Sequence, residues 1–105
     1  MMMNARQEFI EATKGHEVLA AEVIDMRGVY RSGSVTHRLL LDHTPEELGR
    51  FLRSIDFDYD PGFGSQEVDG SIYAKDAIWY RREYDGSEHW RKINTAVPMR
   101  LYQLD

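Results

Sequence analysis

The sequence predicts an α+β domain in which an antiparallel β-sheet of about five strands is covered by two helices, in the order α-β-β-α-β-β-β. Thr44, Pro45 and Glu47 form a capping-box helix start with proline at the first helical position. The Asp85-Gly86 pair separates two runs of strand-forming residues, which is typical of a β-hairpin. Because 105 residues are enough for one core and too few for two, we expect a single domain over the whole chain.

The N-terminal half carries the signals of two helices and a hairpin. Asn4 can cap a short amphipathic helix, and Gly15 suits its end. Residues 17–26 and 35–41 are rich in strand formers and flank a glycine-containing turn, so we expect them to pair. In the helix that follows the capping box, four apolar residues recur at helical spacing and predict one core-facing stripe: Leu48, Phe51, Leu52 and Ile55.

The C-terminal half is expected to form a meander of three strands, over residues 71–75, 78–84 and 88–94. Pro98 then interrupts the pattern, and residues 99–104 can form a short edge strand. Two copies of a chain can pair through an exposed edge strand, so the sequence allows a homodimer as well as a monomer.

Composition limits the classes of protein to which the chain can belong. Hydrophobic residues make up 42% and charged residues 30%, which predicts a folded domain. The formal net charge of −5 argues against general nucleic-acid binding and favours a protein partner. The chain has no cysteine, no apolar run of membrane-spanning length and no signal-peptide core. We therefore expect a soluble cytoplasmic domain without a membrane partner.

Residues 56–67 nearly match the calcium-binding loop of an EF-hand. Carboxylates occupy the first, third, fifth and twelfth positions of the loop: Asp56, Asp58, Asp60 and Glu67. Pro61 stands where the motif needs a left-handed glycine, and the residues after the loop predict a strand instead of the exiting helix. We therefore expect no metal site and no cofactor. The favoured interpretation is a helix-to-strand loop turned at Gly62 and Gly64, and the alternative is a weak cation site.

The hairpin around Asp85-Gly86 has two plausible registers. A two-residue type I′ turn would set Glu83 opposite Glu88, which is an unfavourable like-charge pair. A type I turn with a bulge at the glycine sets Arg82 opposite Glu88, and we favour it. Trp79 and Trp90 then point to opposite faces, so one tryptophan can be partly exposed beside arginines, as in a partner contact. The favoured interpretation is that both tryptophans simply pack in the interior.

Residues 27–38 contain three arginines among glycines and serines, which can hold a phosphate. The segment matches no phosphate-loop or dinucleotide fingerprint, and no helix opens directly after it. A solvated hairpin tip is the favoured interpretation.

No catalytic motif is present, and we expect no catalytic residue. The four histidines are scattered without metal-ligand spacing, and there is neither a cysteine nucleophile nor a Gly-x-Ser-x-Gly elbow. The sequence therefore favours a protein that is not an enzyme.

Two motifs carry a family resemblance. They are Phe-Asp-Tyr-Asp-x-Gly-Phe-Gly-x-Gln-Glu over residues 57–67 and Trp-x-x-Arg-Glu-Tyr-Asp-Gly-Ser-Glu-x-Trp over residues 79–90. With them, residues 57–98 resemble a group of small uncharacterised proteins carried by bacteriophages and other bacterial mobile elements. Members commonly end the second motif with two tryptophans, where this chain has His89-Trp90. The resemblance implies a phage or prophage accessory protein in a bacterial host cell, and it implies no activity, ligand or catalytic residue.

Together these observations predict a non-enzymatic binding module for a host or viral macromolecule. The expected binding surface joins the acidic loop to the hairpin, through Asp58, Tyr59, Asp60, Gly62, Gly64, Glu67, Trp79, Arg82, Glu83, Tyr84, Asp85, Glu88 and Trp90. The alternative is a small-ligand or cation-binding domain, for a nucleotide, a phosphate or weakly held calcium.

Overall fold

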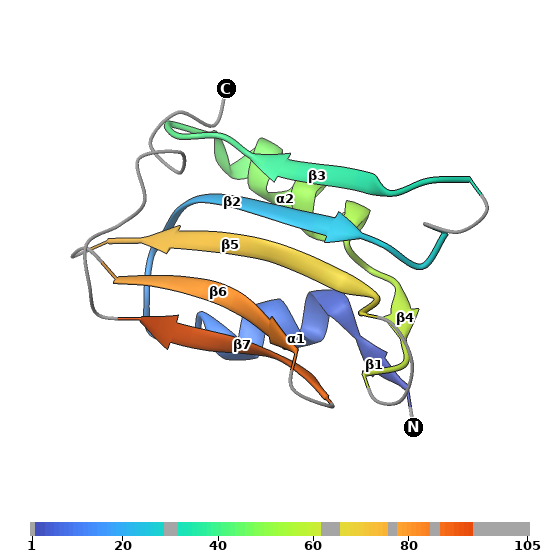
Figure 1. Ribbon diagram of the computed structural model, residues 1–105. Helices are drawn as coiled ribbons and strands as arrows, with labels where there is room; N and C mark the ends of the chain where they lie inside the picture. The colour runs from blue at the N-terminus through green and yellow to red at the C-terminus, as the bar shows by residue number, and fades with distance from the viewer. Residues whose placement is uncertain (1, 29–31, 62–65, 76–77, 85–86, 94–105) are drawn as a thin grey trace.

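The computed structural model describes residues 2–28, 32–61, 66–75, 78–84 and 87–93, with only the backbone for Ile78 and Trp79. The elements in this part of the chain are β1 (Met3–Asn4), α1 (Ala5–Ala12), β2 (Val18–Asp25), β3 (Val35–Leu39), α2 (Pro45–Ser54), β4 (Asp58–Tyr59), β5 (Val68–Ala74), β6 (Ile78–Tyr84) and β7 (Glu88–Ile93) (Figure 1). The predicted α+β fold with two helices and a five-stranded antiparallel sheet is confirmed. The edge strand expected over residues 99–104 lies outside the described residues.

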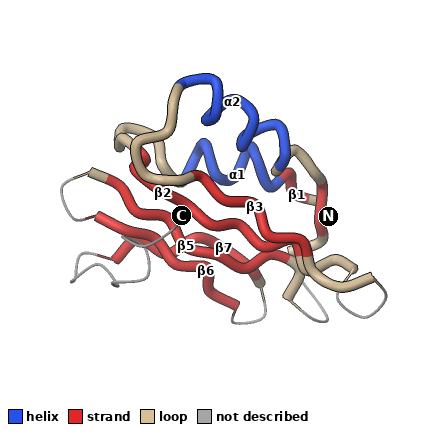
Figure 2. The backbone as a smooth tube through the Cα atoms, turned by 90° about the horizontal axis from the view of Figure 1, so that it is seen from above, coloured by secondary structure: helices blue, strands red, loops and turns tan. Residues whose placement is uncertain are grey.

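The main sheet has the strand order β3-β2-β5-β6-β7, and every neighbouring pair is antiparallel. The predicted β2–β3 hairpin and the β5–β6–β7 meander are both present, and the pairing of β2 with β5 joins them. Both helices lie on one face of this sheet, and no helix of the described part covers the other face (Figure 2). None of the described helices has the length and apolar character needed to cross a membrane.

The two helices begin as their sequences predict. In α2, the Thr44 hydroxyl accepts a hydrogen bond from the Glu47 amide at 3.1 Å, and the Glu47 carboxylate accepts one from the Thr44 amide at 3.0 Å. In α1, the Asn4 side chain accepts the Gln7 amide at 2.9 Å. That helix ends at Ala12, whereas its sequence predicts a helix as far as Lys14.

A second sheet of two short strands was not predicted. β1 pairs antiparallel with β4, with Met3 opposite Tyr59 and Asn4 opposite Asp58. The Ala5 amide also donates to the Phe57 carbonyl at 2.8 Å. Strands of two residues have no hydrophobic period to detect, so sequence patterning gives no sign of them. This small sheet fixes the acidic segment after α2 to the start of α1.

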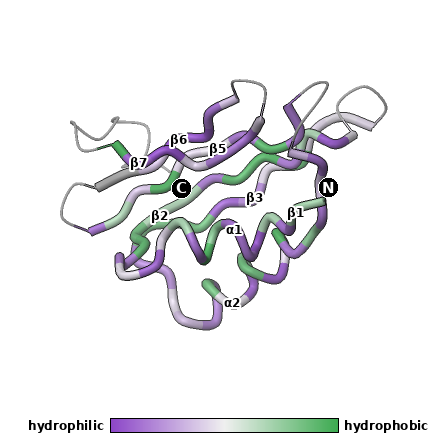
Figure 3. Tube along the Cα trace, turned by 90° about the horizontal axis from the view of Figure 1, so that it is seen from below, coloured by the Kyte–Doolittle hydropathy of each residue, from purple (hydrophilic) through white to green (hydrophobic). Residues whose placement is uncertain are grey.

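The core lies between the helices and the sheet face beneath them. Its buried apolar side chains come from all layers: Ala5, Phe9, Ala21, Val23, Leu39, Phe51, Ile55, Tyr59, Val68, Ile72, Ala74 and Tyr80. Phe9 and Phe51 join the two helices through an edge-to-face contact with ring centroids 5.4 Å apart. Along both helices apolar and polar residues alternate, whereas β6 and β7 are largely polar (Figure 3).

The β6–β7 hairpin adopts neither of the predicted registers. Tyr84 stands opposite Glu88, and Arg82 stands opposite Trp90. The favoured Arg82–Glu88 cross-strand pair is therefore wrong, although both side chains do meet. The expectation weighed only the pairs between the two strands, whereas Arg82 and Glu88 also bind groups outside the hairpin: Glu8 of α1, and the amides of Glu67 and Val68.

Gly70 in β5 stands where the structure leaves no room for a side chain. A Cβ atom at this position would lie 2.2 Å from the backbone oxygen of Glu22 and 3.2 Å from the Trp90 ring. Its φ of +150° is also a conformation that L side chains rarely adopt. The absence of a side chain therefore lets β2 and the indole of Trp90 approach β5 closely.

We expect Gly70→Ala to lower the free energy of unfolding by about 2–4 kcal/mol, because the new methyl group strains both the backbone and the packing. Urea denaturation followed by tryptophan fluorescence measures the change. Gly49→Ala is the matched control, since its nearest neighbour is the Arg53 guanidinium at 3.5 Å. In a helix this control should gain about 0.5–1 kcal/mol. Equal effects of the two substitutions would contradict the assignment.

Candidate functional site

The acidic loop and the hairpin, far apart in the sequence, meet at one end of the sheet. The Glu88 amide donates to the Pro61 carbonyl at 2.8 Å. In return, the Glu88 carboxylate accepts the amides of Glu67 and Val68 at 2.7 and 2.8 Å. The two halves of the expected binding surface are thus joined by backbone groups at both ends of the loop.

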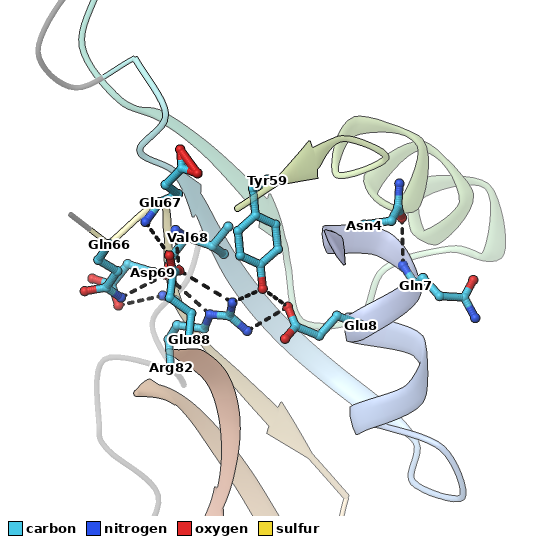
Figure 4. Close-up of polar contacts among 11 residues, drawn as sticks. Asn4, Gln7, Glu8, Tyr59, Gln66, Glu67, Val68, Asp69, Arg82 and Glu88 are labelled. Carbon is cyan, nitrogen blue, oxygen red and sulfur yellow. Dashed lines mark hydrogen bonds and ion pairs between the residues drawn. The ribbon is translucent and has the colours of Figure 1, made fainter. Parts of the chain in front are cut away.

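A buried guanidinium lies at the centre of this junction. Arg82 is 4% exposed, and its guanidinium carbon lies 5.3 Å from the centroid of the Tyr59 ring and 5.2 Å from that of Trp90. Its Nη1 lies 2.8 Å from a Glu8 carboxylate oxygen, and its Nη2 lies 3.6 Å from one of Glu88 (Figure 4). Two carboxylates from opposite sides therefore compensate one desolvated cation.

The Tyr59 hydroxyl connects the cation to the helix. It donates to the Glu8 carboxylate at 2.5 Å and accepts a hydrogen bond from Nη2 of Arg82. Burial, reinforced by the bond to Glu8, raises the pKa of Tyr59 far above its usual value, so the hydroxyl keeps its proton. The protonated hydroxyl can then serve as a donor and an acceptor at once.

Three of the expected binding residues are consequently interior. Tyr59, Arg82 and Glu88 are buried and bind one another or the backbone, so their side chains are not available to a large partner in this conformation. Trp90 is half-buried and contacts Phe9, with ring centroids 6.3 Å apart.

The remaining expected residues lie nearer the surface. Asp58, Asp60 and Tyr84 are exposed, and Glu67 and Glu83 are half-buried. Glu83 lies 3.5 Å from the Arg91 guanidinium. Gly62, Gly64, Asp85 and the side chain of Trp79 lie outside the described residues.

Three exposed carboxylates follow one another on the segment after α2: Asp56, Asp58 and Asp60, named here the acidic edge. The Asn4 amide donates to Asp56 at 2.9 Å and to Asp58 at 3.0 Å. The backbone amide of Asp60 is held by the Glu67 carboxylate at 2.9 Å. Contacts from β1 and from the residue before β5 therefore position this segment.

Arg27 supports the acidic edge from the other side. Its guanidinium lies 4.1 Å above the Phe57 ring, donates to the Asp58 carbonyl at 2.9 Å and pairs with Asp25 at 2.8 Å. The bond from Arg27 holds the pKa of Asp25 below its usual value, against the opposing effect of burial. Arg38 is likewise paired, with Glu22 at 3.1 Å. Arg27 and Arg38, from the segment considered for phosphate binding, are thus paired with carboxylates of this chain.

Among the described residues, no group of three or more histidine, aspartate or glutamate side chains gathers as metal ligands. An apolar cleft of about 340 Å³ opens instead between α1 and α2, lined by Phe9, Ile10, Thr13, His16, Glu17, Val18, His43, Leu48 and Leu52. His43 Nδ1 lies 2.8 Å from the Leu40 carbonyl, which only accepts, so Nδ1 carries a proton in this contact. This cleft had no signal in the sequence, because its walls come from separate elements.

No protein-family model, curated protein or solved structure matches this chain at a significant level. The resemblance to phage-borne proteins therefore stays a prediction, and the functional argument rests on the geometry.

We expect Arg82→Met to lower the free energy of unfolding by about 3–5 kcal/mol, because it leaves buried carboxylates without their cation. The loss should shrink as the pH falls, since a protonated carboxyl group tolerates burial without a cation. Urea denaturation at several pH values measures both effects. Arg53→Met, on the exposed side of α2, is the control and should change stability by less than about 0.5 kcal/mol. A similarly small effect at Arg82 would contradict the role assigned to the network.

Proposed function

We propose that this protein is a non-enzymatic binding module that contacts a basic surface of a host or viral macromolecule through its acidic edge. The observation that carries the proposal is that Asp56, Asp58 and Asp60 are exposed on a backbone that its neighbours hold in place. The phage resemblance supports the host or viral setting, and the net charge of −5 supports a basic partner.

The side chains of Asp56 and Asp58 are held in position by a neutral group. The Asn4 amide that bonds Asp56 and Asp58 is neutral. Arg27 pairs with Asp25 and donates to the backbone oxygen of Asp58. The contacts of Asp56 and Asp58 thus orient two exposed carboxylates, which suits recognition of lysine or arginine side chains.

The way in which the acidic edge is held in place also supports binding through its aspartates. The acidic edge is fixed by the β1–β4 pairing on one side and by the network around Arg82 on the other. A segment that is already ordered loses little conformational entropy when a partner binds. The interior residues of the expected site thus act by holding the exposed ones, and the contact itself falls to the aspartates.

We expect the double substitution Asp58→Ala/Asp60→Ala to weaken partner capture about tenfold or more, because it removes two charge-assisted contacts. Pull-downs from bacterial lysate at two salt concentrations, followed by quantification of the captured proteins, measure the change. Raised salt should weaken capture by the wild-type chain more than capture by the variant.

The matched control is Glu11→Ala/Glu46→Ala, which removes the same charge from exposed positions on the helices. It should retain the partners of the wild-type chain. Equal capture by the two double variants would show that net charge, and not the acidic edge, is recognised. Recovery of no partner by the wild-type chain would also count against the proposal.

The cleft between α1 and α2 favours a second candidate function, the binding of a small molecule. Its volume of about 340 Å³ falls within the range of ligand sites, and its walls are mainly apolar. His16 and His43 supply polar groups beside these walls. This arrangement suits a compact apolar ligand with one hydrogen-bonding group better than a free phosphate or calcium ion.

Thermal denaturation with calcium, magnesium, a nucleotide panel and medium-chain fatty acids separates these ligand classes. A ligand that binds only the folded state raises Tm with concentration. For the cleft we expect a rise of several degrees with the fatty acids alone, lost in Leu52→Lys and kept in Tyr84→Lys outside the cleft. Absence of any rise at millimolar concentration would remove this candidate.

A further inference from the structure

One edge of the main sheet carries an unfilled groove. β3 is an outermost strand, and within the described part of the chain no strand lies beside its outer side. A groove of about 330 Å³ runs between β3 and α2, lined by residues 36–40 of the strand region and by Glu47, Arg50, Phe51 and Ser54. The outward backbone groups of such an edge are free to pair with another strand.

The two outermost strands of the sheet differ in how they present this edge. Of the two exposed cations near the end of β7, Arg91 is paired with Glu83 at 3.5 Å, whereas Lys92 lies 3.3 Å from a ring nitrogen of His16. A lysine on an edge strand discourages pairing with a further strand. β3 instead exposes Val35, which keeps 53% of its surface accessible. The charge of Arg38 in β3 is compensated by Glu22, with 3.1 Å between the paired atoms. The β3 edge is thus apolar at one end and electrically compensated in the middle.

We propose that β3 pairs antiparallel with β3 of a second copy of this chain, so that two five-stranded sheets continue as one in a homodimer. The proposal is independent of the acidic edge. It concerns a different surface, a strand edge that can pair with the same edge of an identical chain.

The symmetry of such a pair fixes its register. A two-fold axis perpendicular to the sheet keeps every residue on its own face, and directly paired residues must share a face. The axis must therefore pass beside one residue that faces its own copy. Only the register centred on His37 uses all five residues of Val35–Leu39.

This register matches the side chains of the two copies. Val35 falls opposite Leu39 of the second copy, which is 2% exposed, so no charged side chain stands against the exposed valine. Thr36 falls opposite Arg38 of the second copy, so the two arginines do not stand directly opposite each other.

The groove wall is compatible with such a pair. α2 contributes one acid and one base to the groove, Glu47 and Arg50. Their formal charges cancel, so these two residues give an identical wall no net charge to repel. The occupant that fits an open edge with an exposed valine and compensated charges is a second copy.

Sedimentation equilibrium of the full chain tests the proposal. We expect a mass of twice 12.3 kDa for the wild-type chain at high concentration. Val35→Lys should weaken the dimer about tenfold or more, because it places a lysine on the paired edge. Ile10→Lys, at an apolar position that is 38% exposed on α1, is the matched control and should leave the dimer unchanged.

A cysteine substitution tests the register separately, since the chain contains no cysteine. His37→Cys should give a disulfide-linked dimer with oxidised glutathione, because directly paired residues have Cβ atoms about 5 Å apart. Glu11→Cys, exposed on α1, should not. A wild-type chain that stays monomeric, or a dimer that survives Val35→Lys, overturns the proposal. A dimer that His37→Cys fails to link overturns the register.

Discussion

The buried guanidinium of Arg82 is the constraint on which one end of this fold depends. Removing a cation from water is costly unless charges and hydrogen bonds replace the solvent. Here the replacements come from four separate segments: Glu8 of α1, Tyr59 of β4, the Val68 carbonyl at the start of β5 and Glu88 of β7. If any one of these segments moved away, the buried guanidinium of Arg82 would lose part of its compensation. A single side chain thus ties the N-terminal helix, the acidic segment and the hairpin together.

The burial of Arg82 also divides the candidate site into buried residues that bind the guanidinium and exposed residues that do not. Tyr59 and Glu88 use their polar groups on Arg82, on α1 and on the backbone that flanks the loop. The aspartates of the acidic edge lie outside this network and face solvent. Residues that stand next to one another in the sequence, such as Asp58 and Tyr59, therefore have different tasks. Asp58 exposes a carboxylate to solvent, and Tyr59 helps to fix the backbone that carries it.

Signals between nearby residues predict the helices and strands. Contacts between residues far apart in the sequence determine which side chains are buried. The capping box of α2 and the Asn4 cap of α1 depend on residues a few positions apart, so the sequence shows them. The ion pair of Arg82 joins it to Glu8, in another element, and no spacing rule links the two residues. The need for Gly70 likewise depends on Glu22 across the sheet. Motifs therefore located the acidic loop and hairpin, but could not tell which of their side chains would be interior.

The pairing of β2 with β5 has a consequence for how the chain reaches its native state. β2 and β3 form one hairpin, and β5 to β7 form a meander, so each group can assemble from neighbouring residues. The seam between them joins residues 18–25 to residues 68–74 and closes a loop that contains α2. Closing such a loop costs entropy before its contacts form. Formation of the seam is therefore the step that we expect to set the folding rate.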